Sequence, residues 1–397
     1  MTGAPRSLLL LQPPGPGLPD RPLVADRERP GGRWASAAGP AWPSTLLVES
    51  AGARGAGLLS VLDAQATHPD AADALGVAHA LRPAAVLALV GGRACAEDPG
   101  FLVRLREVLP EAVIVVSGPA VEAAPAAALQ RFEVADGALL QVGLPGAPWQ
   151  AGRGAPGVAW RGAPAAALPR PAAALLGVPQ LELFPWRRYA DDGFGGLVGQ
   201  PLAQLPWVGG APVPREPAAL RAEAEAWRAA GAVGLRLRGG PLSVEDDAVD
   251  AMLDALRGVG LPHDWELGPA LLDPARAARL AAAGARQLHL AVRLGATEEV
   301  VELAGQPVLV EALRAVVQAA GLPCTLLVDD LDELPAVARA RALTVALGAR
   351  LDLRPGGAQA PAPALVEATS PRRRDRAAAA VRAALRVGAR LARPALA

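Results

Sequence analysis

Short apolar runs alternate with longer amphipathic stretches between residues 7 and 142. Such runs, rich in leucine, valine and alanine, are typical of strands that are buried on both faces of a parallel sheet. We expect strands at 7–12, 58–63, 85–90, 112–116 and 138–142, and helices at 44–55, 70–81, 99–109 and 121–132. The pattern predicts a doubly wound α/β domain, whose ligands bind beyond the carboxyl ends of the strands.

The alternation of strands and helices resumes after a segment that is rich in glycine, proline and alanine. This segment, 146–180, has no sustained period and is expected to be a linker or a covering segment. The repeated strand-helix units beyond it predict a complete or partial (β/α) barrel. We expect strands at 234–237, 265–267, 287–292, 325–328 and 350–353, and helices at 217–230, 244–258, 274–284, 308–320 and 333–346.

Composition narrows the classes of function. The chain has 397 residues, which favours two domains, here expected at 1–145 and 181–360. Its 39 basic residues, all arginine, balance 39 acidic ones, so a general nucleic-acid-binding surface is not expected. No apolar run reaches the length of a membrane span, and no signal peptide is recognisable, so we expect a cytoplasmic protein.

Short motifs stand at the ends of the expected strands of the first half. A Pro-Pro pair follows the first strand, an aspartate ends the second, a Gly-Pro pair follows the fourth, and an aspartate precedes the fifth. In this order they resemble the N-terminal domain of the cobalamin-binding radical S-adenosylmethionine (SAM) family. The resemblance implies a cobalamin site formed by Pro13, Pro14, Asp63, Gly118, Pro119 and Asp136.

The second half resembles the same family. Residues 181–186 are similar to the family's approach to its cluster loop, and 213–217 to the start of the helix after that loop. Residues 237–242 resemble a Gly-Gly-Glu-Pro turn that has lost its glutamate. The resemblance implies a cobalamin-binding-like domain followed by a radical-SAM-like partial (β/α) barrel, with Gly239 and Gly240 at a cofactor-binding turn.

The chain departs from this family at the iron-sulfur cluster. A cluster needs three or four thiolates, closely spaced in sequence. The chain has two cysteines, Cys95 and Cys324, and residues 207–212 replace the cysteine-bearing segment. The family's cluster and SAM are therefore not expected here. The sequence predicts a degenerate, non-catalytic or cluster-independent member that binds cobalamin and assists a partner radical SAM enzyme. The alternatives are an active cobalamin-dependent radical SAM enzyme, for methyl transfer or ring chemistry, and a ligand-free scaffold.

Each candidate residue also has a purely structural interpretation. Asp63 either contacts cobalamin or caps a helix or turn. The glycines of the Gly118-Pro119 and Gly239-Gly240 pairs either allow close approach of a ligand or serve turn geometry. His68 is not expected to ligate cobalt, because Gln65 stands where an Asp-x-His motif has its histidine. Both cysteines are expected to be small buried hydrophobes.

The end of the chain is strongly basic. Residues 371–397 contain eight arginines and one aspartate, and 377–391 are rich in alanine and leucine. This composition predicts a basic C-terminal helix. The helix is either a solvated end of the chain or a docking segment for an acidic protein surface or an anionic membrane.

Overall fold

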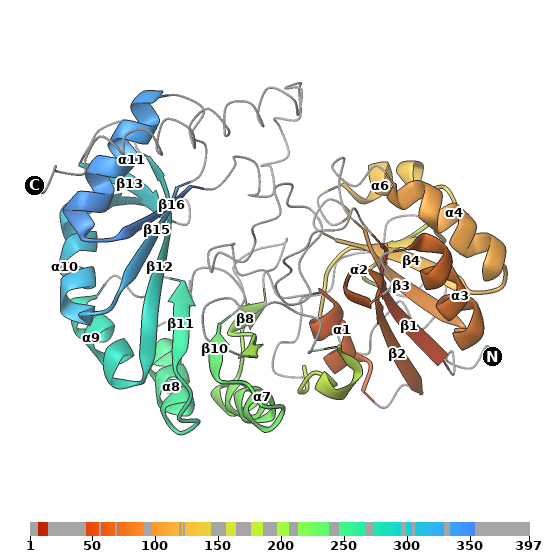
Figure 1. The fold of residues 1–397 in the computed structure, drawn as a ribbon, viewed down its shortest axis with the longest axis horizontal. Coiled ribbons are helices and arrows are strands. Elements are labelled where there is room, and N and C mark those ends of the chain that lie inside the picture. Colours follow the sequence, from red (N-terminus) through yellow and green to blue (C-terminus); the bar gives the residue numbers. More distant parts are fainter. Residues whose placement is uncertain are drawn as a thin grey trace, which may run out of the picture. The chain divides into compact units, whose positions relative to one another are not determined.

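The chain divides into two compact units, Met1–Asp264 and Trp265–Ala397. The computed structural model describes residues 7–14, 45–54, 57–67, 70–90, 97–118, 121, 124–143, 156–163, 176–185, 197–205, 213–237, 246–266, 273–294, 299–303, 306–328 and 334–353. Both units combine sheets with helices, which confirms the expected α/β class (Figure 1). The expected domain bounds stay a prediction.

The first unit begins with a six-stranded sheet in the order β2-β1-β3-β4-β5-β6. The first five strands in this order are parallel, and β6 pairs with β5 in the antiparallel direction. The order 2-1-3-4-5 is that of a doubly wound sheet of the flavodoxin type. The strands are β1 (Ser7–Gln12), β2 (Leu58–Asp63), β3 (Ala85–Leu89), β4 (Val113–Ser117), β5 (Gly137–Leu139) and β6 (Val158–Trp160).

Helices cover both faces of this sheet because its strands are apolar on both sides. Leu9 and Leu11 belong to a core that includes Phe101 of α4, and α3, α4 and α6 lie along one face (Figure 1). Leu8 and Leu10 alternate with them and are equally buried, and α1 contacts β1. The helices are α1 (Thr45–Gly52), α2 (Ala64–Thr67), α3 (Ala71–Leu81), α4 (Asp98–Val108) and α6 (Pro125–Arg131).

The rest of the first unit carries shorter strands and two packed helices. Strands β7 (Val198–Gly199), β10 (Gly234–Arg236) and β11 (His263–Glu266) run parallel, and β11 crosses the division between the units. Strands β8 (Gln204–Leu205) and β9 (Val213–Pro214) form an antiparallel ribbon. The short helix η3 (Leu181–Leu183) precedes them, and helices α7 (Pro217–Ala229) and α8 (Asp246–Arg257) pack against each other.

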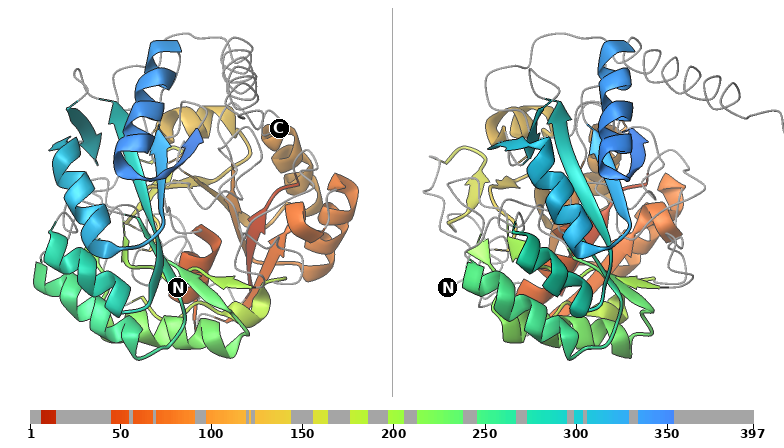
Figure 2. Two further views of the ribbon diagram at one scale, coloured as in Figure 1. Left: turned by 60° about the vertical axis from the view of Figure 1, so that its left-hand side comes forward. Right: turned by 90° about the vertical axis from the view of Figure 1, so that its left-hand side faces the viewer.

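The second unit has three parallel strands and an antiparallel hairpin. The long strand β12 (Ala285–Leu294) runs beside β15 (Cys324–Val328), and β15 beside β16 (Arg350–Leu353) (Figure 2). Strands β13 (Val300–Leu303) and β14 (Gln306–Leu309) extend the sheet from β12. Helices α9 (Pro274–Ala282), α10 (Val310–Ala320) and α11 (Leu334–Leu347) lie on one side of these strands (Figure 1).

The expected strands and helices are present, and most of their bounds agree within two residues. Strand β6 lies inside the expected linker or covering segment 146–180 and belongs to the first sheet, and the role of that segment as a whole stays a prediction. The hairpin β13–β14 and the ribbon β8–β9 were also not expected. All these strands are short and pair antiparallel, so they lack the continuous apolar run of a buried parallel strand. Among the described helices, none is long and apolar enough to cross a bilayer.

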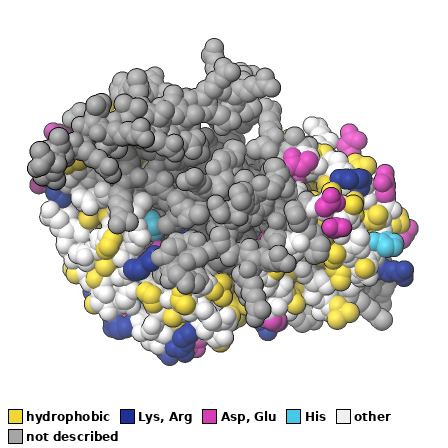
Figure 3. Space-filling view, in the orientation of Figure 1, with side chains coloured by type: hydrophobic (Ala, Val, Ile, Leu, Met, Phe, Trp, Pro, Cys, Tyr) yellow, Lys and Arg dark blue, Asp and Glu magenta, His cyan; other side chains and the backbone are white. Residues whose placement is uncertain are grey.

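Acidic side chains predominate on the exposed surface around α3 and α4 (Figure 3). The exposed acids there are Asp70, Asp73, Glu97, Glu107 and Glu111, and the exposed arginines are Arg82 and Arg104. A surface of this sign repels phosphate backbones. This face therefore does not favour contact with nucleic acid.

Candidate functional site

The carboxyl edge of the first sheet gathers four of the residues singled out from the sequence. Asp63 ends β2 opposite Gln12, the last residue of β1, and Pro13 and Pro14 follow at once. Gly118 follows β4, whose last residue Ser117 pairs with Leu89 of β3. The structure thus places Pro13, Pro14, Asp63 and Gly118 at this edge, and their role in binding stays a prediction.

The edge includes the point at which the order of the strands reverses. Strand β1 lies between β2 and β3, so the chain leaves the carboxyl end of β1 toward one side and that of β3 toward the other. Ligands of open α/β sheets bind at such a switch point, outside the carboxyl ends of the strands. Pro13 stands directly on this point.

The backbone conformation at Gly118 requires glycine. Its φ is +139°, and a Cβ at this position would lie 2.4 Å from the carbonyl oxygen of Val90. The Val90 N–H donates to the Ser117 carbonyl at 2.8 Å, which holds the ends of β3 and β4 together. No side chain fits here, so the turn itself requires glycine, which lets the backbone after β4 pack closely against the end of β3.

Buried polar side chains also mark this edge. Gln12 and Asp63 are buried, and Ser117 is fully buried. The Ser117 Oγ has no hydrogen-bond partner among the described residues. A buried hydroxyl without a partner costs about 1–3 kcal/mol. A polar ligand group or a water at the carboxyl edge would remove that cost.

Asp136 lies elsewhere, which corrects the expectation that it joins the cobalamin site. It precedes β5, and its backbone N–H donates to the Ile114 carbonyl near the start of β4, so it stands at the amino end of the sheet. Its Oδ2 accepts from Arg106 Nη2 at 2.6 Å and from the Ile114 N–H at 2.9 Å. The motif around Asp136 was matched by the order of motifs along the chain. That order does not show whether a residue lies at the amino or at the carboxyl edge of the sheet.

Other candidates fall outside the residues that the structure describes. They are His68, Cys95, Pro119, Gly239, Gly240 and the basic segment 371–397. Cys324 is described and lies in β15, where its side chain is buried. Burial raises the pKa of its thiol to about 12, so it is a neutral thiol at physiological pH. It is therefore a small buried hydrophobe, as expected.

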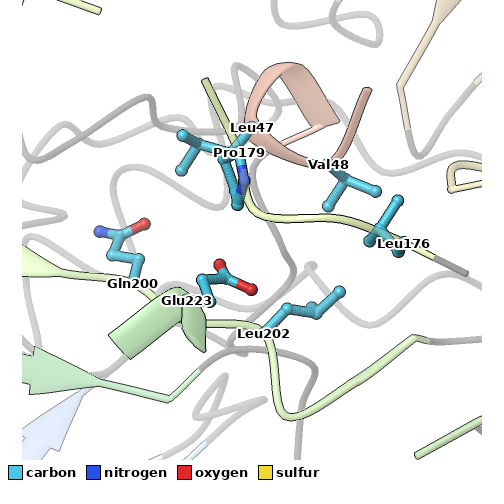
Figure 4. A pocket seen from close by; sticks show the side chains of 7 residues that line it. All are labelled: Leu47, Val48, Leu176, Pro179, Gln200, Leu202 and Glu223. Carbon is cyan, nitrogen blue, oxygen red and sulfur yellow. The ribbon is translucent and has the colours of Figure 1, made fainter. Parts of the chain in front are cut away.

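Sequence reasoning missed a buried polar cluster in the first unit. The Arg215 Nη2 lies 3.2 Å from the Glu223 Oε2, and both side chains are almost fully buried. A small pocket lies beside this pair (Figure 4), lined by Leu47, Val48, Leu176, Pro179, Gln200, Leu202 and Glu223. The sequence carried one weak signal. Glu223 falls on the apolar side of α7, and Arg215 stands shortly before the start of that helix.

Two solved structures share the fold of this chain. One is the radical S-adenosylmethionine methyltransferase TsrM from Kitasatospora setae with cobalamin and a 4Fe-4S cluster bound. It has a TM-score of 0.60 and 17% identity, over 88% of this chain and 75% of that chain. TsrM with its tryptophan substrate and the SAM analogue aza-SAM gives the same TM-score and identity, over 88% of this chain and 73% of that chain.

No protein-family model and no curated protein matches the chain. At 17% identity the likeness to TsrM shows a shared α/β fold. Fold alone does not fix function, which depends on the residues at the site.

Proposed function

We propose that this chain is a cobalamin-binding relative of the radical SAM proteins that holds no iron-sulfur cluster of its own. One observation carries the proposal. The chain matches the fold of a methyltransferase whose structure has cobalamin and a 4Fe-4S cluster bound, over 88% of its own length, yet it contains only two cysteines. The fold therefore supports the cofactor of the first domain, and the residues do not support the cluster.

The residues at the carboxyl edge of the first sheet fit a large polar cofactor. Ser117 offers a buried hydroxyl that has no described partner, and the glycine turn at Gly118 follows it directly. Asp63 offers a carboxylate at the same edge, and Pro13 stiffens the chain where it leaves β1. Bound cobalamin would supply a cobalt centre that carries a methyl group. The chain's own residues would hold and orient the cofactor.

The thiols do not fit an iron-sulfur cluster. A cluster needs at least three thiolates close together, and two cysteines cannot supply them. Cys324 is in addition buried in a strand, with the pKa of its thiol raised to about 12. Without a cluster, this chain would not cleave SAM. Its cobalamin would instead serve a separate radical SAM enzyme.

Titration with hydroxocobalamin tests the proposal. We expect the spectrum of the corrin to change on binding to the full chain. Gly118→Ala should weaken binding at least tenfold, because its Cβ would meet the Val90 carbonyl and displace the turn. Gly76→Ala is the matched control, since nothing lies within 4 Å of the added Cβ on α3. Ser117→Ala, which only removes the hydroxyl, should weaken binding without unfolding the protein.

Two results would contradict the proposal. An unchanged corrin spectrum at millimolar hydroxocobalamin, with a folded protein, would leave the scaffold interpretation. Formation of 5′-deoxyadenosine from SAM above a control without protein would show that the chain is itself a radical enzyme.

A further inference from the structure

Helix α11 of the second unit is apolar on two opposite sides. One side packs into the unit, where Leu343 and Leu347 are buried. The other side carries Ala338, Ala342 and Val345, spaced four and three residues apart, and all three are exposed. Val345 is 83% exposed, and no large apolar side chain among the described residues is more exposed. These three residues form an outer stripe, on the side where a surface helix normally carries polar residues.

The outer stripe stands on a helix that is fixed in the second unit. The Arg314 Nε of α10 donates to the Ala346 carbonyl at 3.0 Å, which ties the end of α11 to α10. The Thr344 Oγ1 donates to the Ala340 carbonyl at 2.6 Å, so this hydroxyl is satisfied within the helix. Of the exposed side chains described on α11, Arg341 alone is charged. A mainly apolar stripe of small and β-branched side chains is suited to packing against a second helix.

The sequence beyond the described residues contains a segment with a matching pattern. In residues 377–393, which we call the tail segment, apolar or small side chains recur at i, i+3, i+4, i+7 and i+11. They are Val381, Ala384, Leu385, Gly388 and Ala392. This spacing places them on one face of an α-helix. An isolated helix of this length that contains a glycine is marginal in water, so its apolar face needs a partner surface.

Four arginines of the tail segment fall on its opposite face. They are spaced four, four and three residues apart, at Arg382, Arg386, Arg390 and Arg393. When the apolar face is turned to α11, their guanidinium groups face water and not Arg341. The basic charge of the tail segment therefore does not oppose contact with the outer stripe.

The chain is long enough for the tail segment to reach α11. The Ala349 N–H donates to the Thr344 carbonyl at 3.0 Å, and β16 begins at the next residue, so this strand starts beside the end of α11. Residues 354–376 join β16 to the tail segment, and about 23 residues of extended chain span at most about 80 Å. Helix α11 has 14 residues and is about 21 Å long.

We propose that the tail segment forms an amphipathic helix that docks on the outer stripe of α11 in the same chain. Small residues on both partners, such as Ala342 on α11 and Ala384 on the tail segment, allow the two helices to approach closely. Val345 and Leu385 supply the larger apolar side chains of the contact. The basic end of the chain is then a covering helix of the second unit, and its arginines form the wet face.

Hydrogen exchange of the full chain tests the docking. In Val345→Asp we expect the amides of the tail segment to exchange at least about tenfold faster than in the unaltered protein, because a carboxylate on the outer stripe disfavours an apolar partner. Leu385→Asp should have the same effect from the other partner. Arg386→Gln is the matched control, since it changes the same turn on the opposite face and should keep the slow exchange.

The position of Val345 keeps this test clear of general unfolding. Its side chain is 83% exposed, so exchange in β12 and β15 should be the same in Val345→Asp as in the unaltered protein. Equal exchange rates of the tail segment in the two proteins would overturn the proposal.

Photo-crosslinking identifies what covers the outer stripe. A photoreactive phenylalanine derivative in place of Val345 should crosslink to peptides of the tail segment and leave the protein a monomer. The same group in place of Leu58, which is 76% exposed in β2, is the control and should give no such product. Crosslinked dimers would assign the stripe to a second copy. Slow exchange that appears only with phosphatidylserine vesicles would assign the tail segment to a membrane. Either result would refute docking within the chain.

Discussion

Asp136 shows how a residue that resembles a cofactor ligand can be a structural one. Its Oδ2 accepts from the Arg106 guanidinium and from the Ile114 N–H. Arg106 also donates to the carbonyls of Ala112 at 2.6 Å and Val134 at 3.1 Å. The aspartate thus fixes α4, β4 and β5 at the amino end of the sheet, opposite the proposed cofactor edge.

We expect Asp136→Ala to lower the free energy of unfolding by about 1–3 kcal/mol, because it leaves the Ile114 N–H and part of the guanidinium without an acceptor. Denaturant titration measures the loss. Binding of hydroxocobalamin by the folded fraction should be unchanged. A stable Asp136→Ala protein that no longer binds the corrin would return Asp136 to the cofactor site.

Cys324 gives a second test at the scale of single residues. In a Cys95→Ala protein it is the only thiol. Because the side chain is buried and its thiol has a pKa of about 12, we expect no labelling by a disulfide reagent in the folded protein at pH 8. One thiol per chain should react once denaturant is added. Rapid labelling without denaturant would show an accessible thiolate.

At the scale of elements, an aspartate caps the start of two helices, α3 and α9. The Asp70 carboxylate accepts from the Ala72 N–H at 2.6 Å at the start of α3, and Asp273 accepts from the Ala275 N–H at 3.0 Å at the start of α9. Each cap satisfies a backbone donor that the first turn of the helix leaves unpaired.

We expect Asp70→Ala to cost about 0.5–2 kcal/mol of stability, because the first turn of α3 loses an acceptor. Asp70→Ser, which keeps a capping oxygen, should recover most of the loss. Thermal unfolding of the two variants compares them directly. Equal midpoints for alanine and serine would show that this cap contributes nothing to stability.

The elements that could be predicted from the sequence are those with one strong periodic signal. The run Leu8–Leu11, short, apolar and followed by two prolines, favours a strand buried on both faces, and the parallel order then places Asp63 and Gly118 at one edge. Strand β6 could not be predicted, because three residues paired antiparallel at an edge carry no pattern. The Arg215–Glu223 pair left only a weak signal, since its pairing depends on a tertiary burial that the local sequence pattern does not show.

At the scale of the whole molecule, shared fold and missing ligands point in different directions. The fold of TsrM recurs over 88% of this chain, while the cysteines that a cluster requires are absent from the sequence. A fold is held by many apolar contacts and tolerates the loss of a few site residues. Under the proposed function, this chain would keep the architecture without the chemistry of the cluster.

Anaerobic reconstitution of the whole chain with iron and sulfide tests whether it can hold a cluster. We expect no stoichiometric cluster, since a cluster needs at least three thiolates. The readouts are bound iron and sulfide after gel filtration and the charge-transfer absorption of the product. A stable cluster with about four irons per chain would require ligands other than cysteine or thiolates from a second copy.

The place of β1 in the first sheet bears on how this protein is made. The strand lies between β2 and β3 in the sheet but is synthesised before both, and these partners begin at Leu58 and Ala85. Four consecutive leucines therefore leave the ribosome before either neighbouring strand exists. Pairing between distant strands is slow, because long loops must close first. The nascent chain should thus need chaperones that capture apolar segments until β3 has emerged.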